Sequence, residues 1–177
     1  MADEKQKALW RAEFEAYLSR VDLEEAKAGL EGLSARLSQA RSLAEFLEAP
    51  KQLLFDMAQE AYFKFQGGRL KEAEAIFKGL TLFEPSIAYF HTALGTVYQK
   101  QKRYFDALVE FTLALEIEPK DVTALCNRAE SFLQFPGGEN LAKEDLEKLL
   151  EVDPQAKSAW AKRGKLLQNK INTLLAK

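Results

Sequence analysis

The sequence has few of the residues on which several kinds of site depend. Among its 177 residues are one cysteine, Cys126, and one histidine, His91. One cysteine excludes an intrachain disulfide, and any zinc site or Cys–His nucleophile would have to use this single pair. No glycine-rich loop follows a strand pattern, as a phosphate-binding loop would. We therefore expect no enzyme activity, no metal and no cofactor.

Long apolar runs and a strong net charge are also missing. No stretch approaches the roughly 18 consecutive apolar residues that cross a membrane. The first residues, MADEKQKALWRAEFEAYL, are charged throughout and lack the apolar segment of a signal peptide. A formal net charge of −2 does not favour binding to nucleic acid or to a membrane surface. We expect a cytoplasmic protein without membrane insertion or a nucleic-acid partner.

Glycine and proline are scarce, with 9 and 5 residues respectively. Long helices joined by short turns suit this composition better than many strands do. The 47% hydrophobic content, interleaved with charges, is typical of a globular chain with a substantial core. The composition therefore favours an all-α protein.

Residues 88–121 contain regularly placed small and large side chains. Gly95 and Ala107 are small where two antiparallel helices would cross, and Tyr98 and Phe111 would fill the space beside the crossing. Pro119 would end the second helix, because proline has no N–H for the helical ladder. Together with Leu94 and Ala114, these residues are most of the tetratricopeptide repeat (TPR) pattern, a helix-turn-helix unit of 34 residues.

The same pattern occurs on either side of this unit. It predicts repeats at 54–87, 88–121 and 122–156, the third with one extra residue in the turn Phe135-Pro136-Gly137-Gly138. Residues 157–175 would form a capping helix with Trp160, Gly164 and Leu167 at landmark positions. The lysine and arginine side chains of this helix are typical of a solvated helix C-terminus. Alternatively, they form a patch that binds a membrane or nucleic acid. The repeat landmarks are Ala61, Ala73, Phe77, Pro85, Ala129, Ala142, Leu146, Leu149 and Pro154.

The predicted fold is an all-α TPR-type helical-hairpin solenoid over residues 50–177, preceded by a helical region at 1–49. In that region a first apolar stripe runs from Trp10 to Val21, and heptad spacing follows from Leu23. This helix either packs on the first repeat or supports a homodimer, and the two are compatible. The predicted dimerisation residues are Leu23, Leu30, Leu33, Leu37 and Leu47.

In TPR arrays the first helix of each repeat lines a concave groove, and the family supplies the positions that face it. We expect these residues to bind an extended segment of a partner, with the aromatic side chains as anchors. Alternatively, some of the aromatic rings pack under the N-terminal helices, and His91 and Cys126 serve mainly in packing. The predicted groove residues are Phe55, Ala58, Tyr62, Phe65, Gln66, Tyr89, Thr92, Thr96, Gln99, Cys126 and Glu130.

One known TPR use is not favoured. Co-chaperones that grip an acidic C-terminal tail use a clamp of Lys and Asn in the first repeat and of Lys and Arg in the third. The corresponding positions here hold Ala58, Tyr62, Thr123 and Asn127. A ligand that ends in a carboxylate is therefore not expected.

The segment from Ser42 to Pro85, including LAEFL and LLFDMAQEAYFKFQGGRLKEAEAIFKGLTLFEP, resembles the class II chaperones of bacterial type III secretion. The resemblance implies a chaperone that holds an extended apolar segment of hydrophobic translocator proteins in the groove, with N-terminal helices that dimerise. The alternative is a generic bacterial TPR adaptor that joins folded proteins. The two differ in whether the partner is folded on its own.

Overall fold

The structure is a computed structural model that describes residue 32 and residues 39–175. The chain divides into two units, residues 1–41 and residues 42–177. The described residues contain helices and turns and no strand. The all-α prediction is thus confirmed for this part of the chain.

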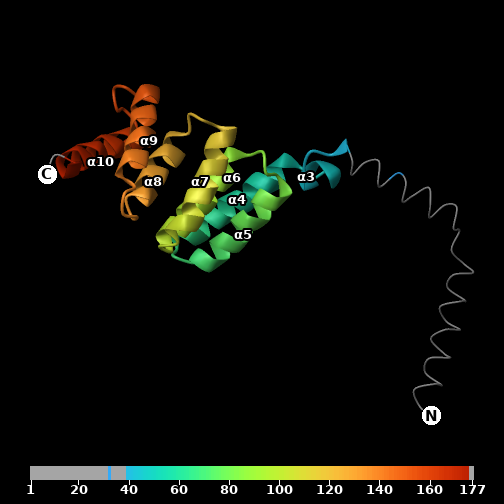
Figure 1. Cartoon of the computed structure of the whole chain (residues 1–177). Helices are drawn as coiled ribbons and strands as arrows, with labels where there is room; N and C mark the ends of the chain where they lie inside the picture. The colour runs from blue at the N-terminus through green and yellow to red at the C-terminus, as the bar shows by residue number, and fades with distance from the viewer. Residues whose placement is uncertain (1–31, 33–38, 176–177) are drawn as a thin grey trace, which may run out of the picture. The chain divides into compact units, whose positions relative to one another are not determined.

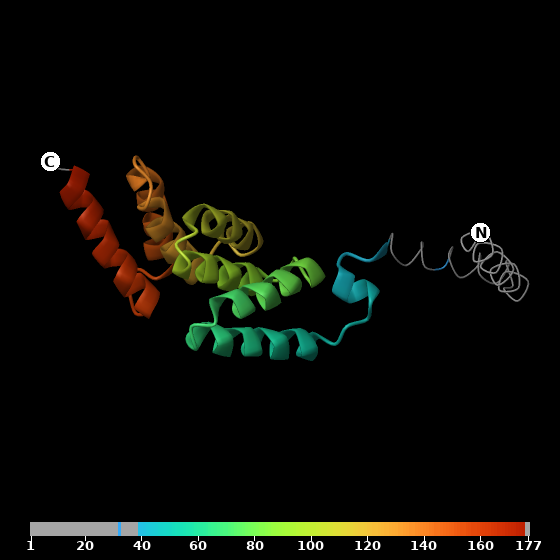
Figure 2. The same cartoon turned by 90° about the horizontal axis from the view of Figure 1, so that it is seen from below.

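A short helix, α3 (Leu43–Phe46), is followed by three helix pairs and a last helix in the second unit (Figure 1). Each helix packs on its neighbours along the chain, and the last helix contacts both members of the third pair. Figure 2 shows the same succession from below. The pairs are α4 (Lys51–Gln66) with α5 (Leu70–Phe83), α6 (Ala88–Lys100) with α7 (Tyr104–Ile117), and α8 (Val122–Phe132) with α9 (Glu139–Val152), followed by α10 (Ala159–Leu175).

The two helices of the second pair cross with almost no space between them. A Cβ atom placed on Gly95 would lie 2.7 Å from Cε1 and 2.8 Å from Cδ1 of Phe111, whose ring is fully buried. Ala107 is also fully buried. The small residues at these positions therefore allow the close crossing that the repeat pattern predicts.

The turns within the pairs follow the repeat as well. Gly68 has φ of 74°, and Lys102, 34 residues later, has φ of 63° in the equivalent turn. Glycine adopts this left-handed conformation at little cost, whereas lysine does not. The third turn, between Phe132 and Glu139, is longer and contains Gly137 with φ of 79°. The predicted insertion therefore lies in this turn.

Asp121 caps α8 as the sequence predicts. Its Oδ1 accepts hydrogen bonds from the backbone N–H groups of Thr123, at 2.8 Å, and Ala124, at 3.1 Å. Its Oδ2 accepts from the hydroxyl of Thr92 at 2.7 Å. One carboxylate thus satisfies two free N–H groups at the start of α8 and joins that helix to α6.

The heptad pattern does not continue as one helix to Leu47. Residues 40–42 are non-helical, and a new short helix, α3 (Leu43–Phe46), begins after Ser42. The Ser42 hydroxyl accepts from the N–H of Glu45 and donates to Glu84 at 2.7 Å, so it caps α3 against the first repeat. Ala44 is buried in the repeat core, while Leu47 is exposed. The other predicted dimerisation residues, Leu23, Leu30, Leu33 and Leu37, lie outside the described residues.

His91, near the start of α6, is buried and joins three parts of the fold. Its Nε2 donates to the carbonyl of Pro85 at 3.1 Å, and its Nδ1 lies 2.8 Å from Oε2 of Glu110 on α7. Both partners can accept, so the geometry favours the protonated ring, which donates from both nitrogens. The hydrogen bond to Glu110 is the main cause that raises the pKa of His91 above 6.5.

We expect Gly95→Ala to lower the free energy of unfolding by about 1–3 kcal/mol, because the new methyl group would overlap the buried ring of Phe111. Gly79→Ala is the matched control. Gly79 lies within α5, where a Cβ meets no atom within 4 Å, so this change should stabilise the helix by up to about 1 kcal/mol. Urea unfolding followed by circular dichroism measures both, and equal effects of the two substitutions would contradict the close crossing.

We expect the stability of the fold to decrease as the pH rises above 6.5. The pKa of His91 is higher in the folded chain than its ordinary value of 6.5, so protonation favours the folded state. This contribution is complete below pH 6.5 and is lost as the pH rises through the folded-state pKa. Urea titrations across neutral pH measure the slope, which His91→Gln should flatten. If the dependence of the unfolding free energy on pH is unchanged in the variant, other titratable groups cause it.

Candidate peptide-binding groove

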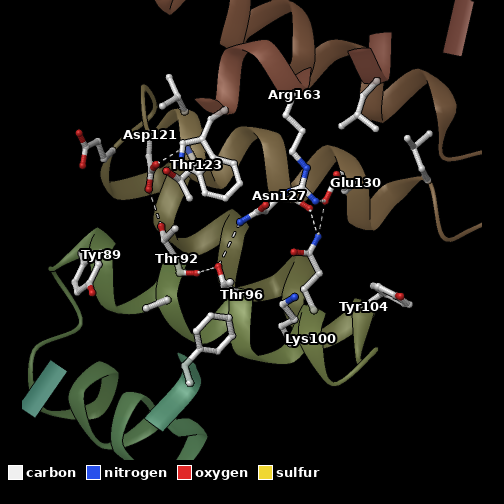
Figure 3. Close-up of a pocket in the computed structure, with 18 of the residues that line it drawn as sticks. Tyr89, Thr92, Thr96, Lys100, Tyr104, Asp121, Thr123, Asn127, Glu130 and Arg163 are labelled. Carbon is white, nitrogen blue, oxygen red and sulfur yellow. Dashed lines mark hydrogen bonds and ion pairs between the residues drawn. The ribbon is translucent and has the colours of Figure 1, made fainter. Parts of the chain in front are cut away.

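A groove of about 980 Å³ runs along α6, α8 and α10. In Figure 3, Tyr89, Thr92, Thr96 and Lys100 follow one another along α6 and face Asn127 and Glu130 of α8, while Arg163 reaches in from α10. Tyr62 and Phe65 of α4 complete its wall on the side of the first repeat. The first helix of each pair and α10 therefore contribute to one surface.

The part of the groove near the first repeat is aromatic. The rings of Tyr62 and Phe65 are stacked with centroids 6.5 Å apart and an interplanar angle of 27°. Tyr62 and Tyr89 keep 45% and 46% of their surface exposed. Partial burial and the neighbouring Tyr62 raise the pKa of Tyr89, so its hydroxyl is neutral at pH 7. These rings are large and rigid, so they can bury apolar groups at low entropic cost.

The middle of the groove is polar and internally hydrogen-bonded. The hydroxyl of Thr96 donates to the carbonyl of Thr92 at 2.8 Å, and Nδ2 of Asn127 donates to the Thr96 hydroxyl at 3.3 Å. Nε2 of Gln99 donates to the carbonyl of Asn127 at 3.1 Å and to the hydroxyl of Ser131 at 3.3 Å. These bonds fix the side chains of α6 relative to α8.

The far end of the groove is charged. Nη2 of Arg163 lies 2.6 Å from Oε2 of Glu130, which joins α10 to α8. The guanidinium group also lies 5.7 Å from the ring centroid of Trp160. Lys100, Lys120 and Lys170 also line the groove, as do Glu118 and Asp121. The charges of the lining are therefore nearly balanced.

The structure brings seven of the predicted groove residues together, namely Tyr62, Phe65, Tyr89, Thr92, Thr96, Gln99 and Glu130. Ala58 and Cys126 are instead buried, with 1% and 0% exposure, because α4 and α8 turn these positions into the core. Burial raises the pKa of the Cys126 thiol to about 12, with a smaller contribution from Glu130. Phe55 and Gln66 are exposed outside the groove, and Gln66 donates to the hydroxyl of Tyr62 at 2.8 Å.

Two groups of lining residues were missed by the sequence interpretation. Asn127 was considered only as a position of the absent carboxylate clamp. On α10, one face presents Trp160, Arg163, Leu167 and Lys170 to the groove. These residues are three, four and three positions apart, so they lie on one face of the helix. This spacing is the sequence signal that identifies α10 as a wall of the groove as well as a cap.

Residue 32 and residues 39–175 contain no group of three His, Cys, Asp or Glu side chains placed to hold a metal ion. None of the helices in this part of the chain combines the length and the apolar character needed to cross a membrane.

No model of a known protein family matches the sequence. The Hsp70-Hsp90 organizing protein 3 of Arabidopsis thaliana is 29% identical over 99 residues, which are 54% of this chain and 18% of that protein. The U-box domain-containing protein 70 of rice, Oryza sativa subsp. japonica, is 29% identical over 136 residues, which are 75% of this chain and 17% of that protein. The chain thus matches less than a fifth of the length of each of these relatives.

Many solved structures share the fold, and three of them illustrate it. A type III secretion system complex from Aeromonas hydrophila superposes with a TM-score of 0.73 at 18% identity, over 82% of this chain and 98% of that one. The Yersinia enterocolitica translocator chaperone SycD, in complex with a peptide of the translocator YopD, gives 0.65 at 21% identity over 71% and 97%. The first TPR domain of Spaghetti (RPAP3), bound to the HSP90 peptide SRMEEVD, gives 0.65 at 20% identity over 72% and 97%.

The helix pairs and these neighbours together define a TPR-type fold, the helical-hairpin solenoid that the sequence predicts. Two of these neighbours were solved with a peptide bound. The resemblance to the translocator chaperones is also confirmed at the level of the fold, since SycD is among the structural neighbours.

Proposed function

We propose that this chain is a cytoplasmic chaperone of type III secretion that holds an extended, partly apolar segment of a translocator protein in its groove. The observation that carries the proposal is the groove itself, where exposed aromatic rings continue directly into hydrogen-bonding side chains. Such a surface offers apolar contacts and backbone hydrogen bonds without demanding one sequence. It suits a client whose apolar segment would otherwise be exposed to water.

The aromatic rings come from two successive repeats. Tyr62 and Phe65 belong to α4, and Tyr89 belongs to α6. Helices packed side by side are about 8–10 Å apart, so a segment that crosses both helices can place successive apolar side chains on successive rings. The groove thus favours an extended segment over a single deeply buried side chain.

The comparisons support a peptide ligand in two forms. One neighbour is a chaperone with a translocator peptide, and another is a TPR domain with the acidic peptide of HSP90. In this chain Ala58, Tyr62, Thr123 and Asn127 stand at the positions of the carboxylate clamp, and Ala58 is buried. These residues supply no cation for a terminal carboxylate, so the groove favours the translocator type of ligand.

A second candidate function is an adaptor that joins folded proteins. On α7, the exposed apolar residues Phe105, Val109, Leu113 and Ile117 follow one another at steps of four and line no part of the groove. A stripe of this kind on the surface of a helix favours contact with a folded partner. This adaptor would not need the aromatic end of the groove.

We also propose that the N-terminal region supports a homodimer, as its heptad spacing suggests. One structural neighbour, SycD, has been solved as a dimer. We expect the full chain to sediment as a dimer and the double variant Leu30→Glu, Leu37→Glu to sediment as a monomer, because two charges would enter the apolar seam. Analytical ultracentrifugation measures this, and a wild-type monomer would leave the seam with an intramolecular role only.

The groove is tested with a peptide selected from a display library of short random peptides on the wild-type chain. We expect Tyr62→Ala and Tyr89→Ala each to cost about 1–4 kcal/mol of binding free energy, as anchors do. Both rings are nearly half exposed, so the fold should remain intact by circular dichroism. Titration calorimetry gives the affinities.

Phe63→Ala is the matched control for this experiment. Phe63 neighbours Tyr62 on α4 and is 57% exposed, but it does not line the groove. We expect its removal to leave peptide affinity unchanged. If no peptide is selected, or if all three variants bind like the wild type, the groove is not the site. The adaptor function of α7 is then preferred, with Phe105→Ala as its first test.

A further inference from the structure

We propose that the outer face of α10 binds the surface of an anionic phospholipid membrane, with lysine side chains against the lipid headgroups and Leu166 at the edge of the acyl chains. The outer face comprises Lys162, Lys165 and Leu166, none of which lines the groove. The membrane contact is therefore independent of what the groove holds. It gives the chain a second interaction surface, whose partner is a bilayer that the chain touches from one side.

The charge of the chain is distributed unevenly along the sequence. The last 21 residues contain six Lys and Arg residues and no Asp or Glu. Because the formal net charge of the whole chain is −2, the residues before this segment have a net charge of −8. A cationic end on an otherwise acidic protein orients the molecule in the field of a negative surface. The segment that contains α10 is thus the part of the chain that such a surface attracts.

Packing on the third repeat fixes which side of α10 is exposed. Ala161 and Ile171 are fully buried. A Cβ atom placed on Gly164 would lie 3.1 Å from Cδ2 of Leu149 and 3.3 Å from Cδ2 of Leu146, so the backbone of α10 lies close to α9. A rotation of α10 would break these contacts. The opposite side of the helix is consequently held toward solvent.

The outer face combines two free ammonium groups with an uncovered leucine. Lys162, Lys165 and Leu166 stand at positions i, i+3 and i+4, so they lie on one side of the helix. Leu166 keeps 71% of its surface exposed. In the part of the chain that the structure describes, neither lysine has an ion-pair partner. Figure 2 shows α10 as the last helix of its unit, so this face is accessible.

This combination favours a membrane over nucleic acid. The arginine of α10, Arg163, is paired with Glu130 at 2.6 Å, so the planar guanidinium group that suits the phosphates of nucleic acid is already engaged. Lysine acts as a point charge, which is sufficient for attraction to anionic headgroups. The Leu166 side chain leaves water when it lies at the boundary between headgroups and acyl chains. A phosphate backbone offers leucine no such contact.

The outer face and the groove use different residues of the same helix. Arg163 and Lys170 line the groove, whereas Lys162, Lys165 and Leu166 do not. A segment in the groove and a membrane on the outer face therefore do not compete for side chains. The chain can hold a client while α10 rests on a bilayer.

The proposal is tested by sedimentation of the full chain with vesicles of two parts phosphatidylcholine and one part phosphatidylserine. We expect binding at low ionic strength that is lost at about 0.5 M salt and is absent with phosphatidylcholine alone. The double variant Lys162→Gln, Lys165→Gln should bind about twentyfold more weakly, because each lysine near the surface contributes about fivefold. Leu166→Ala should weaken binding about threefold or more, because less apolar surface leaves water.

The double variant Lys71→Gln, Lys148→Gln is the matched control. These exposed lysines lie on α5 and α9 and have no ion pair within the described residues. The control changes the net charge by the same amount and leaves α10 intact, so we expect it to keep most of the vesicle binding. Equal losses in the two double variants would overturn the proposal, since net charge and not α10 would then control binding. Circular dichroism verifies the fold of each variant.

Contact of position 166 with lipid is measured by a polarity-sensitive dye on the Leu166→Cys variant. The native Cys126 is fully buried, and burial raises the pKa of its thiol to about 12, so the dye reacts at position 166. We expect a blue shift of the emission with the anionic vesicles and none when the dye is attached to Lys148→Cys. An emission that stays unshifted at position 166 while the chain is bound would overturn the proposed face.

The remaining outcomes assign α10 to another role. If the vesicles do not bind but a labelled DNA duplex does, and Lys162→Gln, Lys165→Gln loses the duplex, the partner is nucleic acid and the membrane proposal is wrong. If neither binds, the outer face is only solvated. The proposed function is judged separately, because Lys162→Gln, Lys165→Gln should keep the peptide affinity of the groove and Tyr62→Ala should bind vesicles like the wild type.

Discussion

The contact between Gly95 and Phe111 controls the geometry on which the rest of the second unit depends. The ring of Phe111 occupies the space where a glycine Cβ would be, so α6 and α7 can lie closer together than ordinary side chains allow. Equivalent small residues, Ala61 and Ala129, are fully buried in the neighbouring pairs. Because each pair closes in the same way, the first helices of successive repeats line up, and a continuous groove results.

The groove combines two kinds of surface, one aromatic and one polar, that use different positions of the repeat. Its aromatic end uses positions at which α4 and α6 keep large rings partly exposed, as in Tyr62 and Tyr89. Its polar part uses side chains that already bond one another across α6 and α8, such as Thr96 and Asn127. The first surface exposes apolar rings to solvent, and the second joins α6 to α8 by hydrogen bonds.

Much of this could be predicted from the sequence, because the TPR landmarks are local and regular. The spacing of Gly95 and its equivalents gave the helix pairs, the turns and the longer third turn. The groove was predicted less well. Ala58 and Cys126 belong to the buried core of the repeats, and a helix position taken from the family does not distinguish a core residue from a groove residue. The hydrogen bond from Asn127 to Thr96 depends on where a threonine hydroxyl points, and no sequence pattern contains this information.

Different side-chain contacts connect the first repeat to the second and the second repeat to the third. At the joint between the first and second repeats, α6 has no side-chain cap, and His91 links the Pro85 carbonyl to Glu110. At the next joint, Asp121 caps α8 and accepts from Thr92. In a linear array, unfolding spreads from one repeat to the next through such contacts. The attachment of the first repeat, which carries Tyr62 and Phe65, therefore weakens as the pH rises through the pKa of His91, whereas the Asp121 contacts between the second and third repeats do not involve this histidine.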